Sequence, residues 1–223
     1  MMNRRFFPLL MLPILLLSAG CPDGGGGDGE HKGTAPSSVA VSPNGSFLYV
    51  SNLGLNSVSA YTIGGTGALT PIAGSPFPAG VNPSAVTVSP NGSFLYVGNQ
   101  GANTVTAYTI GGAGALTPIT GSPFPVEANP SAVTISPNGD FLYVSNQGSN
   151  NVSTFTITAG TGILVPLAPG VGNPFAAGTS PSAVMVSPNG SFLYVSNQGS
   201  NDVSAFTITA STGTLAPIAG SPF

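Results

Sequence analysis

Basic side chains are almost absent from this 223-residue chain, which contains three Lys and Arg residues and one His. All four precede residue 33, as Arg4, Arg5, His31 and Lys32, and no basic side chain follows in the rest of the sequence. Proteins neutralise nucleic-acid phosphates with Lys and Arg, so we expect no nucleic-acid partner. Without a His in the main part of the chain, a Ser-His-Asp triad cannot be built either.

Cysteine is equally scarce: Cys21 is the only one, which excludes an internal disulfide. The preceding residues 1–20 have two Arg residues and then an apolar stretch, Phe6–Leu17, that is shorter than a bilayer-spanning helix. We predict a signal peptide over 1–20. Its end, Leu17-Ser-Ala-Gly-Cys21, resembles the lipobox of bacterial lipoproteins, although Ser18 stands where Leu is usual.

That resemblance implies that Cys21 carries a lipid anchor to the membrane, and it places the protein at the cell envelope, on the periplasmic face or the cell surface. The alternative is an ordinary secretory signal with an incidental Cys. Residues 21–35 contain four consecutive glycines and too few apolar side chains to fold, so they predict a flexible tether. His31 lies in this tether, where we interpret it as a solvated side chain.

The abundant feature is a repeat. The nine residues Ser-Pro-Asn-Gly-Ser-Phe-Leu-Tyr-Val occur four times, once with Asp for the second Ser, beginning at Ser42, Ser89, Ser136 and Ser187. The spacings are 47, 47 and 51 residues. Repeats of this length with several strand signals are typical of propeller blades, each a four-stranded sheet. No stretch after the signal region has the periodicity of an amphipathic helix.

The second repeat divides into four predicted strands separated by turns rich in Gly and Asn. The strands are expected over 83–88, 93–98, 104–110 and 115–119, with the Asn-Gly turn after the first. The other repeats follow the same pattern, which gives blades over 36–82, 83–129, 130–180 and 181–223. The sequence therefore predicts an all-β propeller of four-stranded blades, with four blades visible.

Ring closure is a physical problem for such a chain, because every repeat runs from its innermost to its outermost strand. Three arrangements remain open: a four-bladed ring, two chains that form an eight-bladed ring as a homodimer, and a piece of a longer array. An open arc would expose apolar blade faces. We favour a partial arc or a dimer over a closed monomer.

The few carboxylates of the repeats are the candidate catalytic groups: Glu127, Asp140 and Asp202. Asp140 and Asp202 replace polar turn residues, and we interpret both as surface substitutions. Glu127 lies in a connection between two repeats that can approach the propeller channel, so it is the weak candidate for a general base. Calcium usually requires several carboxylates, and the Gly-rich stretches lack the Lys of a phosphate loop. We therefore expect no metal site and no cofactor.

The four strand ends Tyr49–Asn52, Tyr96–Asn99, Tyr143–Asn146 and Tyr194–Asn197 resemble the signature of YVTN-type β-propellers. The wider group includes lactonase-like propellers with seven blades, among them 6-phosphogluconolactonases. This resemblance implies a propeller fold and, as one option, hydrolysis of a lactone. The sequence departs from what a phosphorylated substrate requires, because its repeats contain no Arg, Lys or His.

Two functions are compatible with these features. Near-identical blades display repeated Ser, Asn and Gln side chains, a surface suited to an envelope protein or a glycan. Catalytic pockets need residues that differ from their neighbours, and here these are few. We therefore predict a cell-envelope-anchored binding or structural module, with a lactonase-like hydrolase as the alternative.

Overall fold

The computed structural model describes residues 35–168 and 173–223, which belong to one compact unit. The predicted signal peptide, Cys21 and His31 lie outside the described residues, so the signal peptide and the lipid anchor stay predictions. Within the described ranges, no helix is long and apolar enough to cross a membrane.

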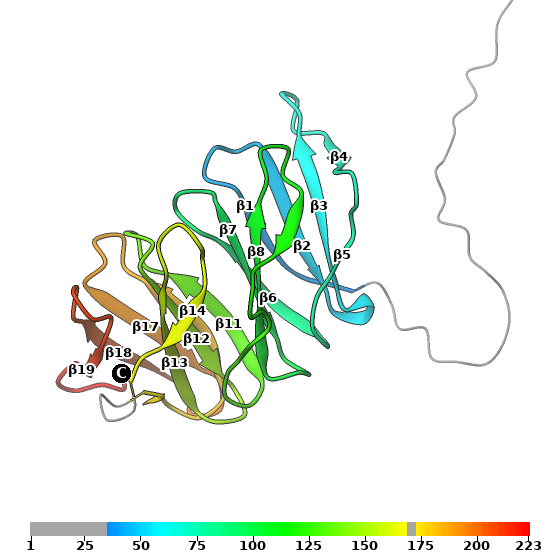
Figure 1. Ribbon diagram of the computed structural model, residues 1–223. Coiled ribbons are helices and arrows are strands. Elements are labelled where there is room, and N and C mark those ends of the chain that lie inside the picture. Colours follow the sequence, from blue (N-terminus) through cyan, green and yellow to red (C-terminus); the bar gives the residue numbers. More distant parts are fainter. Residues whose placement is uncertain (1–34, 169–172) are drawn as a thin grey trace, which may run out of the picture. The chain divides into compact units, whose positions relative to one another are not determined.

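The described residues form four antiparallel sheets that follow one another along the chain (Figure 1). Blade 1 contains β1 Pro36–Val41, β2 Phe47–Asn52, β3 Ser57–Ile63, β4 Leu69–Pro71 and β5 Phe77–Pro78, with a 3-10 turn at Leu53–Leu55. Blade 2 contains β6 Pro83–Val88, β7 Phe94–Asn99, β8 Thr104–Ile110, β9 Leu116–Pro118 and β10 Phe124–Pro125. Blade 3 contains β11 Pro130–Ile135, β12 Phe141–Asn146, β13 Asn151–Ile157, β14 Leu164–Pro166 and β15 Phe175–Ala176. Blade 4 contains β16 Pro181–Val186, β17 Phe192–Asn197, β18 Asp202–Ile208 and β19 Leu215–Pro217. The all-β propeller predicted from the sequence is confirmed.

The first three blades each have a short fifth strand that the sequence analysis did not predict. In blade 2, Phe124 and Pro125 pair with Val105 and Thr104 of β8, beside the predicted outer strand β9. These two residues were assigned to the connection between blades. The Pro cannot donate a hydrogen bond to the ladder, but at a sheet edge this costs little.

The repeated Ser-Pro-Asn-Gly segment forms the turn between the first two strands of each blade, as predicted. In blade 1 the Ser42 hydroxyl donates to Asn44 Oδ1 at 2.6 Å and accepts the Phe47 N–H at 2.9 Å. Gly45 follows at φ +71°, a conformation that side chains with a Cβ rarely adopt. The motif is therefore a turn fixed by its own side chains.

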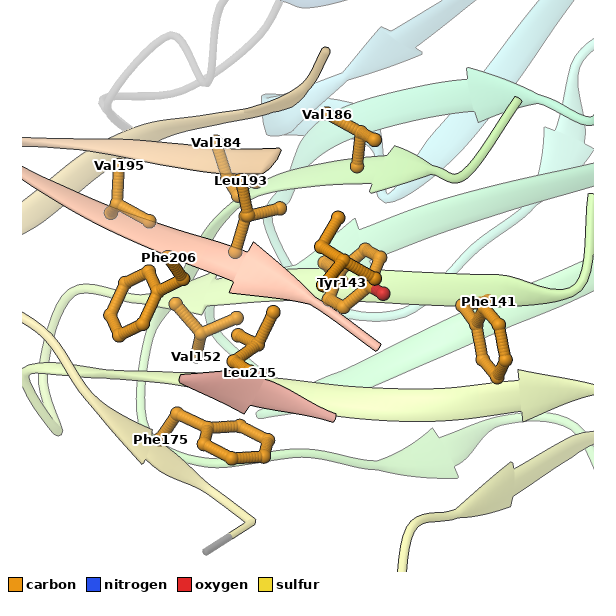
Figure 2. Close-up of a cluster of buried hydrophobic side chains, with 11 residues drawn as sticks. Phe141, Tyr143, Val152, Phe175, Val184, Val186, Leu193, Val195, Phe206 and Leu215 are labelled. Atoms are coloured by element: carbon orange, nitrogen blue, oxygen red, sulfur yellow. The ribbon is translucent and has the colours of Figure 1, made fainter. Parts of the chain in front are cut away.

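Apolar side chains are buried between blades. Leu95, Tyr96 and Val97 on β7 have no exposed surface, because β7 is covered by a neighbouring blade on both faces. Figure 2 shows the corresponding cluster between the last two blades, where Tyr143 of β12 lies among side chains that include Leu193 of β17. At about 25 cal/mol per Å² of buried apolar area, these interfaces are the main source of stability.

Two series of hydrogen bonds connect each blade to the next. A tyrosine hydroxyl on the second strand donates to a glycine carbonyl of the following blade, in the pairs Tyr49–Gly114 at 3.0 Å, Tyr96–Gly162 at 2.8 Å and Tyr143–Gly213 at 3.2 Å. A serine hydroxyl on the first strand donates to a proline carbonyl of the following blade, in the pairs Ser37–Pro83 at 2.6 Å, Ser84–Pro130 at 2.7 Å and Ser131–Pro181 at 2.7 Å. All three interfaces therefore share one geometry.

The innermost strands pack in chain order: β1 beside β6, β6 beside β11, and β11 beside β16. The four blades form an arc that leaves one face of blade 1 and one face of blade 4 uncovered (Figure 1). This is the partial, open propeller that the sequence analysis favoured over a closed four-bladed ring.

Candidate functional site

The three carboxylates of the repeats lie in three different environments. Asp140 is exposed in its turn, where Asn138 Nδ2 donates to Asp140 Oδ2 at 2.7 Å. Asp202 accepts from Asn197 Nδ2 at 2.7 Å and from the Ser200 hydroxyl at 3.0 Å, so its carboxylate supports a turn. Asp140 lies in a turn as interpreted, whereas Asp202 is the first residue of β18 and pairs with Asn197. No group of three or more metal-ligating side chains occurs within residues 35–168 and 173–223.

Glu127 occupies a position that belongs to glycine in the other connections between blades. The connection after β10 carries Glu127 where the connections after β5 and β15 carry Gly80 and Gly178. A Cβ added to Gly80 would lie 2.6 Å from Asn99 Cγ, and one added to Gly178 would lie 2.5 Å from Asn197 Nδ2. A side chain at this position therefore requires the connection or the neighbouring Asn to shift.

The side-chain oxygen of the neighbouring Asn is paired in blade 2 and unpaired in blades 3 and 4. In blade 2 the Gly80 N–H donates to Asn99 Oδ1 at 3.1 Å. The equivalent Asn146 Oδ1 is buried and has no hydrogen-bond partner among the described residues, as is also true of Asn197 Oδ1 in blade 4. The Nδ2 group of Asn146 donates to Asn151 Oδ1 at 2.8 Å and to Ser153 Oγ at 2.9 Å. The unpaired oxygen occurs beside Gly178 as well as in blade 3, so it does not depend on the Glu127 side chain.

Glu127 stands at the rim of a groove of about 200 Å³ between its connection and the outer half of blade 3. Its walls are the mostly apolar side chains of Val126, Phe155 and Pro166, and its polar groups include Glu127, Ser153 and Asn173. We call this space the Glu127 groove. The Ser149 hydroxyl donates to Glu127 Oε2 at 3.4 Å, which orients the carboxylate.

The hydroxyl of Ser153 is the polar group of the groove that can still donate. Ser153 is buried and accepts a hydrogen bond from Asn146, while its own proton has no acceptor within the described parts of the chain. The Asn173 side chain, in contrast, is occupied by the backbone of Thr154 and Leu167. The groove therefore combines one carboxylate, one free hydroxyl donor and apolar walls.

Four further grooves within the described residues lack that combination. The equivalent groove of blade 4, of about 170 Å³, has Gly178 in place of the carboxylate. At the opposite ends of the blades, grooves of about 340, 260 and 170 Å³ lie between the Asn-Gly turns of adjacent blades. Asp140 lines the last of these, and the other two are formed by uncharged side chains and backbone.

Glu127 was predicted because carboxylates are scarce and because its connection can approach the channel, and the structure neither brings it to the other carboxylates nor pairs it with a basic group. Ser149, which donates to Glu127, and Ser153, which lines the same groove, were not predicted. An alignment of the three connections between blades would have revealed the signal, since Glu127 stands where the other two have glycine.

Solved structures of known proteins share this fold. A protein from Bacteroides uniformis, provisionally assigned as a 6-phosphogluconolactonase, is 21% identical with a TM-score of 0.73 over 82% of this chain and 53% of its own. The periplasmic gluconolactonase of Pseudomonas aeruginosa is 26% identical with a TM-score of 0.71 over 84% of this chain and 55% of its own. Hydrazine synthase of Kuenenia stuttgartiensis is 26% identical with a TM-score of 0.63 over 89% of this chain and 53% of its own.

The chain thus spans about half the length of the solved structures that it matches. No curated protein matches it significantly. The profile of the family described as "Lactonase, 7-bladed beta-propeller" matches residues 23–110, 68–175 and 168–222, which cover nearly all of the repeat region. The chain belongs to this lactonase β-propeller family.

Proposed function

We propose that the protein hydrolyses an uncharged lactone, with Glu127 as the general base. The observation that carries this proposal is the Glu127 groove, where the connection carries a carboxylate in place of glycine beside a free serine hydroxyl. Membership of the lactonase family and the similarity to a gluconolactonase support it. This was the alternative in the sequence analysis, which preferred an envelope-anchored binding or structural module.

The proposed reaction needs a base and a donor to the developing oxyanion. Glu127 takes a proton from a water molecule, whose oxygen attacks the carbonyl carbon of the lactone. The Ser153 hydroxyl donates to the carbonyl oxygen as negative charge develops there. The ring C–O bond then breaks, and the leaving alkoxide takes the proton back from Glu127, which gives the open hydroxy acid and restores the carboxylate.

The proposed substrate is small and carries no phosphate. Phosphate groups are bound by Arg and Lys side chains in most proteins, and the sequence has neither after Lys32. The groove of about 200 Å³ is below the range of roughly 300–1,000 Å³ typical of sites for drug-sized ligands. A single sugar-lactone ring is therefore the class of substrate that we propose.

The first experiment compares Glu127→Gln with the full-length wild-type chain on glucono-δ-lactone and on its 6-phosphate. We expect turnover of the neutral lactone, and a loss of about 10²- to 10⁴-fold in kcat for Glu127→Gln, as is usual when a general base is removed.

Asp140→Asn is the matched control, because it neutralises an exposed turn carboxylate and should leave kcat unchanged. Equal turnover by wild type and Glu127→Gln would remove Glu127 from the mechanism. Absence of turnover in the wild type would favour the binding module over the hydrolase.

A further inference from the structure

The two ends of the arc expose positions that the other blades bury. On blade 4 we define the leading face by Met185 of β16, Tyr194 of β17 and Val203 of β18, whose side chains lie on the same side of the sheet. Met185 pairs with Tyr194, and Val203 lies two residues before Ala205, the partner of Tyr194 on β18. Tyr194 is 44% exposed and Val203 is 37% exposed, whereas the equivalent Tyr143 and Val152 of blade 3 are fully buried.

On blade 1 we define the trailing face by Val39, Val41 and Leu69, which lie on the opposite side of their sheet. Leu69 is 48% exposed and Val39 is 63% exposed. The equivalent Leu116 and Val86 of blade 2 are both 6% exposed, because blade 1 covers them. Each end of the arc therefore presents one half of an interface that the chain builds three times internally.

Gly67 shows the missing contact at a single position. The equivalent glycines of blades 2, 3 and 4 each lie against a phenylalanine of the preceding blade: an added Cβ would be 2.6 Å from Phe47 at Gly114, 2.5 Å from Phe94 at Gly162 and 2.4 Å from Phe141 at Gly213. At Gly67 the same Cβ would meet nothing within 4 Å. Conversely, Phe192 of blade 4 has no glycine of a following blade beside it.

We propose that two copies of this chain associate head to tail, with the leading face of each against the trailing face of the other, and close an eight-bladed ring. The three internal interfaces fix the register. Tyr194 donates to the carbonyl of Gly67 of the second copy, and Phe192 packs beside that glycine. Ser182 donates to the carbonyl of Pro36 of the second copy.

The occupant follows from complementarity. A leading face is covered inside this chain by the trailing face of a repeat and by nothing else, and blade 1 is the repeat whose trailing face is free. None of the six residues that define the two faces is charged, so no like-charge repulsion opposes the contact.

A two-fold axis along the channel makes both contacts at once. The second contact is then intramolecular, which raises its effective concentration. Propellers of four to eight blades are known. Eight blades require about 45° per blade instead of about 51° in a seven-bladed ring, a change of about 6° at each interface.

Cysteine cross-linking tests the register directly. A Cβ added to Gly98 lies 3.8 Å from the Pro130 Cβ of the following blade, which is the mean Cβ–Cβ distance of a disulfide. The equivalent pair across the proposed contact is Ser196 of one copy and Pro36 of the other. We expect full-length chain with Ser196→Cys and Pro36→Cys to form a two-chain species on oxidation that reduction reverses.

Each single variant is a control that also retains Cys21. The pair Ser145→Cys and Pro181→Cys, across the equivalent interface inside the chain, should form a disulfide within one chain. Absence of the two-chain species from the double variant, while the internal pair is oxidised, would overturn the proposed register.

Sedimentation equilibrium of the full-length chain tests the assembly without new cysteines. We expect wild type at twice the chain mass and Val203→Glu at the chain mass, because a carboxylate would be buried at the leading face. Val165→Glu, at a valine that is 48% exposed on the outer strand β14, should keep twice the chain mass. A wild-type mass of one chain, or an open-ended series of larger masses, would overturn the two-copy ring.

Discussion

The tyrosines of the second strands show how one residue type at one repeat position acquires different roles. Tyr49, Tyr96 and Tyr143 are fully buried, and each donates its hydroxyl to a glycine carbonyl of the next blade. Tyr194 has the same neighbours in sequence, but it is 44% exposed and its hydroxyl donates to no carbonyl within the described residues. The hydrogen bond is therefore a property of the interface and not of the repeat sequence.

This difference predicts unequal effects of the same substitution. Tyr96→Phe leaves the buried carbonyl of Gly162 without its donor and should lower the free energy of unfolding by about 1–3 kcal/mol. Tyr194→Phe should change it by less than about 0.5 kcal/mol when both variants are made in the Val203→Glu background, which keeps the chain monomeric. Urea denaturation of the two variants measures both values, and equal effects would contradict the assigned role of the hydroxyl.

At the candidate site, Glu127 was predicted because carboxylates are scarce and because its connection can approach the channel, and its role stays a prediction. Ser149, in the turn before β13, and Ser153, on β13, were not predicted, because nothing in the sequence distinguishes them from the other serines of the repeats. Their role depends on which hydroxyl protons remain free after the strands have paired. That result of backbone geometry could not be read from the sequence.

At the scale of elements, strands of the same sequence have different burial in different blades. The outer strands β4 and β9 are both Leu-Thr-Pro, yet Leu69 is 48% exposed and Leu116 is 6% exposed. The position of the blade in the arc decides how much each strand stabilises the protein.

We therefore expect Leu116→Ala to lower the free energy of unfolding by about 2–5 kcal/mol, as for other buried leucines. Leu69→Ala should lower it by less than about 1 kcal/mol when both are measured in the Val203→Glu background, which keeps the chain monomeric. Thermal or urea unfolding checks this pair. A loss of stability as large at Leu69 as at Leu116 would contradict the open arc.

The main strands could be predicted because alternating apolar residues between Asn- and Gly-containing turns have few other readings. The first and third strands of blade 2 have the predicted bounds, and the second and fourth differ by one residue at each end. The two-residue strands β5, β10 and β15 could not be predicted, because two residues are too few to show a periodicity. In addition, β5 and β10 each contain a Pro, a residue that is rare in strands.

At the scale of the whole molecule, the scarcity of ionisable groups restricts how stability responds to pH. No His lies in the described residues, and the groups whose pKa is shifted there are buried tyrosines. Burial raises the pKa of Tyr49 and of Tyr108 to about 12, and it raises the pKa of Tyr96 and Tyr143 as well.

The folded state therefore holds these phenol protons more tightly than the unfolded chain, whose tyrosine pKa is about 10. Their contribution to stability is fully present below about pH 10 and is lost as the pH rises toward 12. We expect the urea midpoint to fall steeply above about pH 10. A midpoint that stays constant up to about pH 12 would show that the tyrosines are not buried as described.

The number of blades in the assembled protein is the property that the sequence could predict least. The three internal interfaces use the same residue types at the same repeat positions, so no residue of a single repeat records how many neighbours the ring contains. The family profile describes seven blades, whereas four repeats are visible here.

The serine and tyrosine bonds described above all run from an earlier blade to a later one. Each blade therefore presents the same donors to the blade that follows it and the same acceptors to the blade that precedes it, whatever its place in the sequence. Unequal recombination between repeats can therefore add or remove a blade while these serine and tyrosine hydrogen bonds between blades are kept. In such a protein the size of the ring can evolve independently of the chemistry on its rim.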